Sequence, residues 1–415
     1  MHSSRLLAFP VVVSFGICLA VSISAHAQEW TRFRGPNGSG LGNAPNFPAK
    51  FSETDFNWKI ALPGSGHSSP VLWGNRIFIT CVPPSTAKRI ALCIDARDGK
   101  IVWERSYEST AFRQHADNSY ASMSPAVDSE RVYIWWGAPE GSSLVALDQK
   151  DGREVWKKDL GSFVSQHGPG ASPIVFENTV ILHFDQDQPT SFLAAFDAKT
   201  GAQRWKLTRP GTSSTASTPC ILQTAAGPQI VAISRTAGLI AVEAKTGALQ
   251  WEIPDLLSKR CVASPIVTPG GLIIAQCGEG RAESFVYAVR PPHDGKPPEK
   301  VYEVVRTGGY VPTPIAVGEY LFLWKEDGLV TCLRSGTNEQ IWSERVQGPF
   351  YSSPVCVNNH LYNLTRKGDL VVLKAGDKFE EVARIPLGEG SHATPAVAGG
   401  RMFLRTFSHL ISVGK

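Results

Sequence analysis

The sequence contains little charge, and this limits the partners it can have. Only 19% of the 415 residues are charged, the formal net charge is +4, and three residues are methionine. A chain this close to neutral is not expected to bind nucleic acid, or to bind an anionic membrane surface through a polybasic segment. Its apolar share of 42% is too high for a disordered protein and is enough for a sizeable core.

The motifs of common catalytic and metal sites are also missing. No G-x-S-x-G turn, H-E-x-x-H pair or phosphate-binding glycine loop occurs. The segment 185–187 (Asp-Gln-Asp) resembles part of a calcium loop, but it lacks the terminal Glu, which favours a tight loop. An ion shared by His67 and His392 is a weaker possibility, because no short-range ligand spacing supports it. We therefore assign no catalytic residue and no metal ligand.

The cysteines form no recognisable framework. Without Cys18 in the N-terminal segment, seven remain, with no C-x-x-C and no adjacent pair. Most lie in apolar, strand-like stretches, which favours free, buried thiols. Two bridges within a repeat stay open as alternatives, Cys81 with Cys93 and Cys261 with Cys277.

Residues 1–27 have the organisation of a secretory signal peptide. Arg5 precedes an apolar run over residues 6–23, and residues 25–27 (Ala-His-Ala) form a small-x-small cleavage site. We expect cleavage after Ala27 and a periplasmic or extracellular protein, with an uncleaved anchor as the alternative. No later stretch is long and apolar enough to span a bilayer, so we expect at most a peripheral membrane association.

Proline and glycine, by contrast, are abundant, and the prolines mark a repeat. The chain has 38 Gly and 29 Pro, which indicates many turns. A Ser/Thr-Pro dipeptide followed by an apolar or small residue recurs at eight regularly spaced places, at Pro70, Pro125, Pro173, Pro219, Pro265, Pro314, Pro354 and Pro395. The mean spacing of about 46 residues suits one four-stranded propeller blade.

A second motif, D-x-x-[TD]-G-x-x-x-W, closes most repeats. It covers residues 95–103, 148–156 and 197–205, with Glu first in 243–251 and a degenerate copy in 334–342. The acidic residue can accept turn amides, and the Gly supplies a positive φ. The Trp then lies on an outer strand and can fill the space between blades. We predict this structural docking role for Trp58, Trp103, Trp156, Trp205, Trp251 and Trp342; Tyr302 stands at the equivalent place in the fifth repeat.

The two ends of the repeat region complete each other. Residues 57–60 resemble an outer strand without inner strands, whereas residues 393–413 offer three strands without an outer one. Pairing them closes a ring without free sheet edges. The sequence therefore predicts an all-β fold, an eight-bladed β-propeller of four-stranded antiparallel blades over residues 57–415. An N-terminal arm, residues 28–56, is expected to pack on it.

These repeats resemble the pyrroloquinoline-quinone (PQQ) type, or tryptophan-docking, repeat of bacterial quinoproteins, over residues 57–415. The compact secreted chain is similar to the PQQ-like group that includes the outer-membrane assembly factor BamB. It departs from BamB in lacking a lipoprotein-processing box at Cys18. It departs from quinoprotein alcohol dehydrogenases, which hold PQQ with calcium and a vicinal disulfide, in having no adjacent cysteines.

The innermost strands of a propeller line its channel, so the residues before each Ser/Thr-Pro are expected to gather at one mouth. Such loops are most simply solvated or bonded to neighbouring backbone, but these residues offer three imidazoles, two phenols and a guanidinium, which would also suit a ligand or partner site. The eight residues are His67, Ser122, His167, Ser214, Arg260, Tyr310, Tyr351 and His392.

The resemblance and the lack of a catalytic motif together favour a noncatalytic, monomeric scaffold that binds an envelope protein or peptide. A PQQ-dependent alcohol or sugar dehydrogenase is the alternative. In that case calcium would accompany the quinone, and Arg260 would polarise it.

Overall fold

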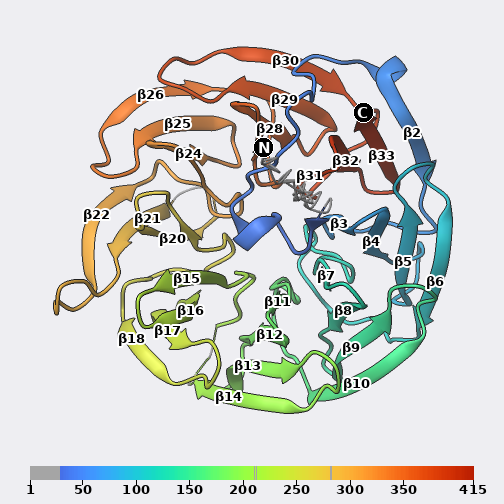
Figure 1. Ribbon diagram of the computed structural model, residues 1–415, viewed down its shortest axis with the longest axis horizontal. Helices are drawn as coiled ribbons and strands as arrows, with labels where there is room; N and C mark the ends of the chain where they lie inside the picture. The colour runs from blue at the N-terminus through green and yellow to red at the C-terminus, as the bar shows by residue number, and fades with distance from the viewer. Residues whose placement is uncertain (1–28, 210, 212, 281–282) are drawn as a thin grey trace, which may run out of the picture.

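The computed structural model describes residues 29–209, 211, 213–280 and 283–415. The predicted signal peptide and its cleavage site lie outside the described residues. Figure 1 shows the described chain as a ring of eight antiparallel sheets around a central channel. The predicted eight-bladed propeller is thereby confirmed. Among the described residues, no helix could cross a membrane.

The first four blades follow one another along the chain. Blade 1 holds β3 (Val71–Trp73), β4 (Arg76–Cys81), β5 (Arg89–Asp95) and β6 (Ile101–Tyr107). Blade 2 holds β7 (Ala126–Val127), β8 (Arg131–Trp136), β9 (Ser142–Asp148) and β10 (Glu154–Gly161). Blade 3 holds β11 (Ile174–Phe176), β12 (Thr179–Phe184), β13 (Ser191–Asp197) and β14 (Gln203–Arg209). Blade 4 holds β15 (Cys220–Thr224), β16 (Gly227–Ser234), β17 (Gly238–Glu243) and β18 (Leu249–Ile253).

The remaining blades continue around the ring to its start. Blade 5 holds β19 (Ile266–Val267), β20 (Ile273–Glu279), β21 (Glu283–Arg290) and β22 (Glu299–Val305). Blade 6 holds β23 (Ile315–Val317), β24 (Tyr320–Trp324), β25 (Leu329–Arg334) and β26 (Gln340–Arg345). Blade 7 holds β27 (Val355–Val357), β28 (His360–Leu364), β29 (Asp369–Lys374) and β30 (Glu381–Pro386). Blade 8 holds β31 (Ala396–Ala398), β32 (Arg401–Arg405), β33 (His409–Gly414) and β2 (Phe56–Ala61).

Blade 8 closes the ring by joining the two ends of the repeat region. Its outer strand β2 pairs antiparallel with β33, with Trp58 opposite Ser412 and Ile60 opposite Leu410. The predicted closure is confirmed. The arm before β2 contains β1 (Glu29–Trp30) and two 3-10 turns, η1 (Pro36–Gly38) and η2 (Glu53–Asp55). Because β1 pairs with β3, it adds a fifth strand to blade 1.

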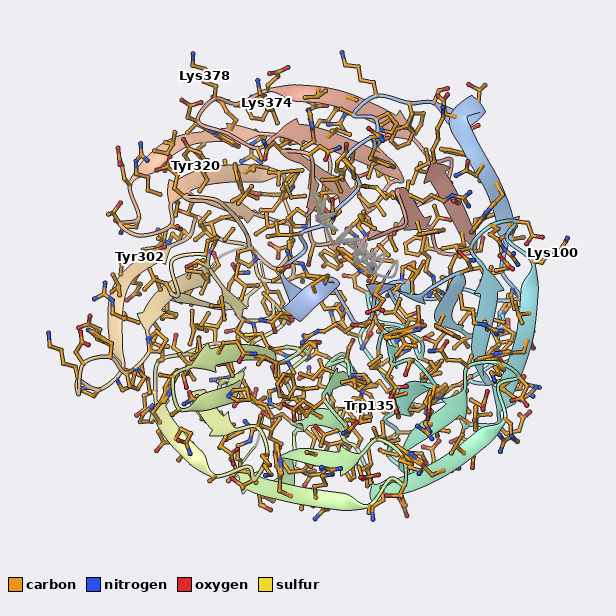
Figure 2. The ribbon with its side chains drawn as sticks, viewed as in Figure 1. Lys100, Trp135, Tyr302, Tyr320, Lys374 and Lys378 are labelled. Carbon is orange, nitrogen blue, oxygen red and sulfur yellow. The ribbon has the colours of Figure 1, made fainter. Side chains whose placement is uncertain are left out.

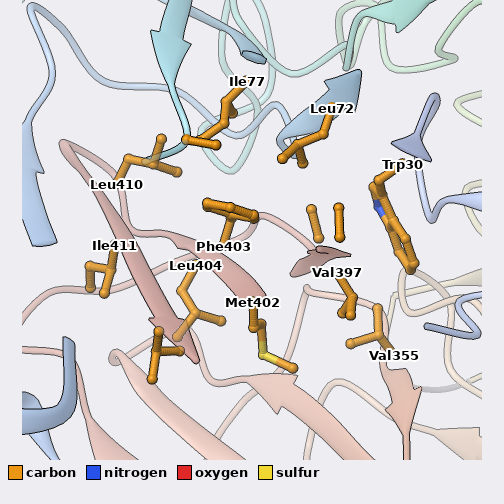
Figure 3. Close-up of a cluster of buried hydrophobic side chains, with 14 of the residues drawn as sticks. Trp30, Leu72, Ile77, Val355, Val397, Met402, Phe403, Leu404, Leu410 and Ile411 are labelled. Carbon is orange, nitrogen blue, oxygen red and sulfur yellow. The ribbon is translucent and has the colours of Figure 1, made fainter. Parts of the chain in front are cut away.

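The core consists of apolar layers between neighbouring blades. The largest layer joins blades 7, 8 and 1, and Figure 3 shows Trp30 of the arm beside Val355 and Val397 within it. Strand alternation sends successive side chains to opposite faces of a blade. On β8, Trp135 therefore packs toward blade 3 and Trp136 toward blade 1, and both are buried. Figure 2 places Trp135 within the ring, whereas Lys100 extends from its outer edge.

The outer tryptophans lie against the turn of the next blade. Trp156 Nε1 donates a hydrogen bond to Ala198 O at 3.0 Å. Gly201 in that turn has φ +72°, and a Cβ there would lie 2.7 Å from the Trp156 ring, so only glycine fits. The equivalent bonds run from Trp58 to Ala96, Trp103 to Gln149, Trp205 to Ala244 and Trp342 to Gly376, and from the Tyr302 hydroxyl to Ser335.

Trp251 is the exception among these residues. Its Nε1 donates to Gln229 Oε1 of its own blade at 2.8 Å. In blade 5 a longer, proline-rich loop, residues 291–298, replaces the usual turn. The next blade thus supplies no turn carbonyl to Trp251.

All seven cysteines of the described chain are free and buried, so neither bridge left open by the sequence forms. Cys81 packs with blade 8 and Cys93 with blade 2, because they face opposite sides of blade 1. Cys261 and Cys277 share one apolar layer as thiols. Burial raises the pKa of Cys277 to about 11, which keeps it protonated at neutral pH.

Candidate functional site

A closed circle of hydrogen bonds surrounds the channel, and the Ser/Thr-Pro repeat builds it. The backbone N–H of Ser69 donates to Ser124 Oγ at 2.8 Å, and each later copy donates in the same way to the next. The N–H of Thr394 donates to Ser69 Oγ at 2.9 Å and completes the circle. The following proline disfavours a helical conformation at the Ser/Thr. The dipeptide therefore joins each blade to its neighbour.

The N-terminal arm closes one end of the channel, which we call the far mouth. Figure 1 shows the arm crossing the centre of the ring. The guanidinium of Arg34 donates to Pro314 O and Pro354 O, both at 3.0 Å, in blades 6 and 7. Asn37 bonds both backbone groups of Ile221 in blade 4. The prediction that the arm packs on the propeller is thus correct, and the arm also spans the channel.

The arm arginines carry charge into the protein and have no carboxylate partner among the residues that the structure describes. Arg32 is 5% exposed and Arg34 is fully buried. Burial lowers the pKa of Arg32 to about 10 and that of Arg34 to about 9, so both remain protonated at neutral pH. Their side chains bond to backbone carbonyls of three blades. The far mouth is therefore positively charged below the cavity described next.

The other end of the channel, the near mouth, holds a cavity of about 980 Å³. Phe33 of the arm lies at its base. The structure places all eight residues selected from the sequence around it, namely His67, Ser122, His167, Ser214, Arg260, Tyr310, Tyr351 and His392. That the cavity binds a ligand stays a prediction.

A long connection between blades 1 and 2, residues 108–122, reaches across the near mouth; we call it the covering loop. Asp117 at its tip forms an ion pair with Arg366 of blade 7 and accepts a hydrogen bond from the Tyr351 hydroxyl at 3.0 Å. The neighbouring Asn118 donates to His167 O at 2.6 Å, next to blade 3. Blades 3 and 7 are opposite one another in an eight-membered ring. The tip therefore lies over the channel axis.

Blades 7 and 8 hold Arg366 in place. Its Nε donates to His392 Nε2 at 3.1 Å, and its guanidinium lies 4.2 Å from the centre of the Tyr351 ring. His392 packs against His67, with ring centres 4.4 Å apart. Burial, and next the charge of Arg366, lowers the pKa of His392 to about 4. Burial likewise lowers the pKa of His67, so both imidazoles are neutral at pH 7.

The opposite wall carries two arginines without carboxylate partners. Arg260 donates to Ser214 O at 3.1 Å and to the Tyr310 hydroxyl at 3.2 Å. Arg235 is exposed at the cavity and has no hydrogen bond or ion pair within the described residues. Burial and the charge of Arg260 lower the pKa of His167 to about 4. The cavity lining also includes the carboxylates of Asp187 and Glu279, and Glu279 forms an ion pair with Lys259.

The carboxylates around the cavity already have partners. Asp187 accepts the backbone N–H groups of Gln166 and Ser214 at 2.7 and 2.6 Å. Glu326 accepts those of Tyr310 and Val311, and burial raises its pKa. In contrast, six hydroxyls of the Ser/Thr circle line the cavity and donate no hydrogen bond within the described residues: those of Ser69, Ser172, Thr218, Thr313, Ser353 and Thr394. The cavity has free donors and few free acceptors.

Comparison with known proteins places this architecture in a family. A family profile described as outer membrane protein assembly factor BamB matches residues 87–344 and 292–378. The chain belongs to this BamB family. No curated protein matches its sequence.

Solved structures share the fold at low sequence identity. BamB from Moraxella catarrhalis is 14% identical with a TM-score of 0.62, over 86% of this chain and 96% of that one. Quinohemoprotein alcohol dehydrogenase from Comamonas testosteroni is 13% identical with a TM-score of 0.66, over 93% and 80%. The computationally designed protein Ika8 is 12% identical with a TM-score of 0.58, over 86% and 98%. A BamB, an enzyme and a designed protein thus share this fold, and function must be argued from the site.

The residues of this BamB-family cavity do not fit PQQ with calcium. Calcium requires several oxygen ligands, usually including free carboxylates. Asp117, Asp187 and Glu326 are each committed to a donor of the protein. No group of three or more His, Cys, Asp or Glu side chains in the described part of the chain could hold a metal. The seven free cysteines also provide no vicinal disulfide.

Sequence reasoning missed the residues that come from outside the repeated positions. Asp117 and Asn118 belong to the covering loop, and Arg235, Glu326 and Arg366 lie in turns between strands. A signal for the loop was present, because the interval between Pro70 and Pro125 is the longest between copies of the Ser/Thr-Pro repeat. No comparable signal marked the turn residues.

Proposed function

We propose that this protein is a noncatalytic propeller of the bacterial cell envelope that binds a segment of another protein at the near mouth. The observation that carries the proposal is the cavity of about 980 Å³, whose donors are free while its carboxylates are committed. Such a site can bind an extended segment through hydrogen bonds. The BamB family membership supports an envelope location and protein partners.

The described part of the cavity offers hydrogen-bonding groups, and its His–carboxylate contact, His115 Nδ1 to Asp117 Oδ2 at 4.0 Å, is too long for a hydrogen bond. His392 Nε2 accepts from Arg366 and is not available as a base. The seven cysteines are buried thiols, and those of Cys261 and Cys277 have raised pKa values. No serine at the cavity donates to an imidazole within the described residues. A binding role therefore accounts for the near mouth more simply than hydrolysis does.

Site-specific photo-crosslinking in the native envelope tests the proposal. A crosslinking amino acid at Arg235, exposed at the near mouth, is expected to give a defined protein adduct. The matched control is Leu41, which is 39% exposed on the arm at the far mouth and is expected to give none. An adduct from position 41 with none from position 235 would contradict the proposal.

Isothermal titration with PQQ plus calcium, followed by a dye-linked alcohol oxidation assay, tests the enzymatic alternative. We expect no quinone-dependent turnover, because the cavity does not supply a calcium ligand set. Turnover by the purified protein that depends on both additions would replace the scaffold function with a dehydrogenase.

A further inference from the structure

The near mouth already binds one carboxylate, and this carboxylate is a side chain of the protein itself. Asp117 is 249 residues away from Arg366 in the sequence, yet its carboxylate lies on that guanidinium and on the Tyr351 hydroxyl. One oxygen contacts the guanidinium and the other accepts from the phenol at 3.0 Å. Arginine and tyrosine donors on the two oxygens of one carboxylate form a charge-assisted recognition site. We call Arg366 and Tyr351 the carboxylate clamp.

The clamp is held in position without help from Asp117. Arg366 donates to His392 at 3.1 Å and stacks on Tyr351, and His392 packs on His67 and Phe407 with ring centres 4.4 and 5.2 Å apart. These residues all come from blades 7, 8 and 1. A preformed donor set can exchange one carboxylate for another at little cost in reorganisation.

Asp117 is held where water and other anions can compete for its place. The side chains of Asp117 and Arg366 are each 30% exposed. Ion pairs with this access to solvent contribute little, about 0–1 kcal/mol. The covering loop that carries Asp117 forms no strand or helix over residues 108–122. An incoming carboxylate can therefore displace Asp117 without unfolding a secondary structure element.

The cavity behind the clamp also contains hydrogen-bond donors without partners in the described part of the chain. Arg260 and Arg235 lack carboxylate partners within the described residues, and six hydroxyls of the Ser/Thr circle are free to donate. The buried guanidinium groups of Arg32 and Arg34 add positive charge beneath it. Asp187, Glu279 and Glu326 line the same cavity and are already bonded to donors of the protein, so its unpaired donors favour a ligand that brings its own acceptor oxygens.

We propose that the near mouth binds the carboxylates of an acidic, extended peptide segment, and that Asp117 is an internal occupant of the same clamp that the segment displaces. This inference rests on the proposed binding function and specifies the chemistry of its partner. The covering loop acts as a competing internal ligand at the clamp, while Asn118 of the loop stays hydrogen-bonded to His167 O.

Titration calorimetry at low salt with three peptides tests the carboxylate requirement. The probes are a hexaglutamate with both ends blocked, a blocked hexaglutamine, and a hexaglutamine with a free C-terminal carboxylate. We expect the hexaglutamate to bind at least tenfold more tightly than the blocked hexaglutamine. Binding of the free-acid peptide alone would assign the clamp to a chain terminus rather than to side chains. Equal affinities for all three would overturn the inference.

Two variants test the competition. Asp117→Asn removes the internal carboxylate and is expected to tighten hexaglutamate binding by about three- to tenfold, whereas Arg366→Gln is expected to weaken it by at least tenfold. The matched control is Asp151→Asn, an exposed outer-turn residue, which is expected to change nothing. If Arg366→Gln fails to fold, the Asp117→Asn variant alone tests whether Asp117 competes with the peptide for the clamp. Unchanged or weaker binding by that variant would overturn the displacement.

The outcomes also separate this inference from the proposed function. A protein adduct from position 235 together with equal affinity for all three peptides would keep the binding function and overturn the acidic partner. A missing adduct together with selective hexaglutamate binding would keep the carboxylate clamp and overturn the protein scaffold.

Discussion

The two mouths of the channel are closed by different means. The far mouth is closed by the arm, whose Arg34 is fully buried and bonds to backbone carbonyls of blades 6 and 7. The near mouth is covered by a loop held through the partly exposed pair of Asp117 and Arg366. Buried charged hydrogen bonds are costly to break, whereas an exposed ion pair is not. We therefore infer that the far mouth is a structural closure and that the near mouth is the one suited to the proposed binding function.

A substitution in the arm is expected to have the largest effect on the free energy of unfolding. Arg34→Ala leaves the carbonyls of Pro314 and Pro354 without their donor and removes a fully buried side chain. We expect a loss of about 2–4 kcal/mol in the free energy of unfolding, measured by denaturant titration. Arg97→Ala, at an exposed turn, serves as the control and should leave the free energy of unfolding nearly unchanged. A loss below about 1 kcal/mol for Arg34→Ala would remove the distinction between the mouths.

Acid is expected to weaken the near mouth through His392. Its folded-state pKa is lowered to about 4 by burial and by Arg366, so the unfolded chain binds its proton more readily. The neutral imidazole makes its full contribution to the free energy of unfolding above about pH 6.5. That contribution is lost as the pH falls toward 4, which lowers the free energy of unfolding by roughly 2–3 kcal/mol. His392→Gln, which keeps an acceptor for Arg366, should reduce this dependence when unfolding is measured between pH 4 and 7. An unchanged pH profile would contradict the buried neutral imidazole.

The Ser/Thr circle lies between the two mouths. Substitutions at one of its positions test whether its hydrogen bonds stabilise the contact between blades. Thr218→Val keeps the shape but removes the acceptor of the Ser172 N–H, which is buried. We expect a loss of about 1–3 kcal/mol in unfolding free energy. Thr218→Ser keeps the acceptor and should cost less than about 1 kcal/mol. Equal losses for the two variants would show that the hydroxyl is not what joins the blades.

The covering loop gives the smallest expected effect on stability. Asp117→Asn removes an exposed ion pair and should lower the unfolding free energy by less than about 1 kcal/mol. Its thermal unfolding curve should nearly overlay that of the unaltered protein. A loss comparable to that of Arg34→Ala would mean that the loop is part of the structural closure.

The repeated features of the molecule were predictable, because each recurs eight times or nearly so. The Ser/Thr-Pro spacing gave the number of blades, and Trp58 with residues 393–413 gave the closure. The residues before each dipeptide were also correctly gathered at one cavity, since the repeat places them all at the same end of the inner strand.

What the sequence could not reveal comes from segments that occur once. Nothing local indicates that Arg34 will meet Pro314 and Pro354, or that Asp117 will meet Arg366, because these contacts join residues more than 240 positions apart. They depend on the ring being closed, which brings the arm and the covering loop over its centre. The hydrogen-bonding role of the Ser/Thr-Pro hydroxyls is likewise visible only between neighbouring blades.

The contrast between the two mouths can be measured by amide hydrogen exchange of the purified protein, with and without hexaglutamate. We expect strong protection at Gly40 and Gly42 of the arm, where Gly42 N–H donates to Cys356 O at 2.8 Å, and no change there when peptide is added. We also expect fast exchange over residues 108–122 that becomes faster as the peptide displaces Asp117. Equal protection of the arm and the loop, or peptide effects confined to the arm, would contradict this contrast.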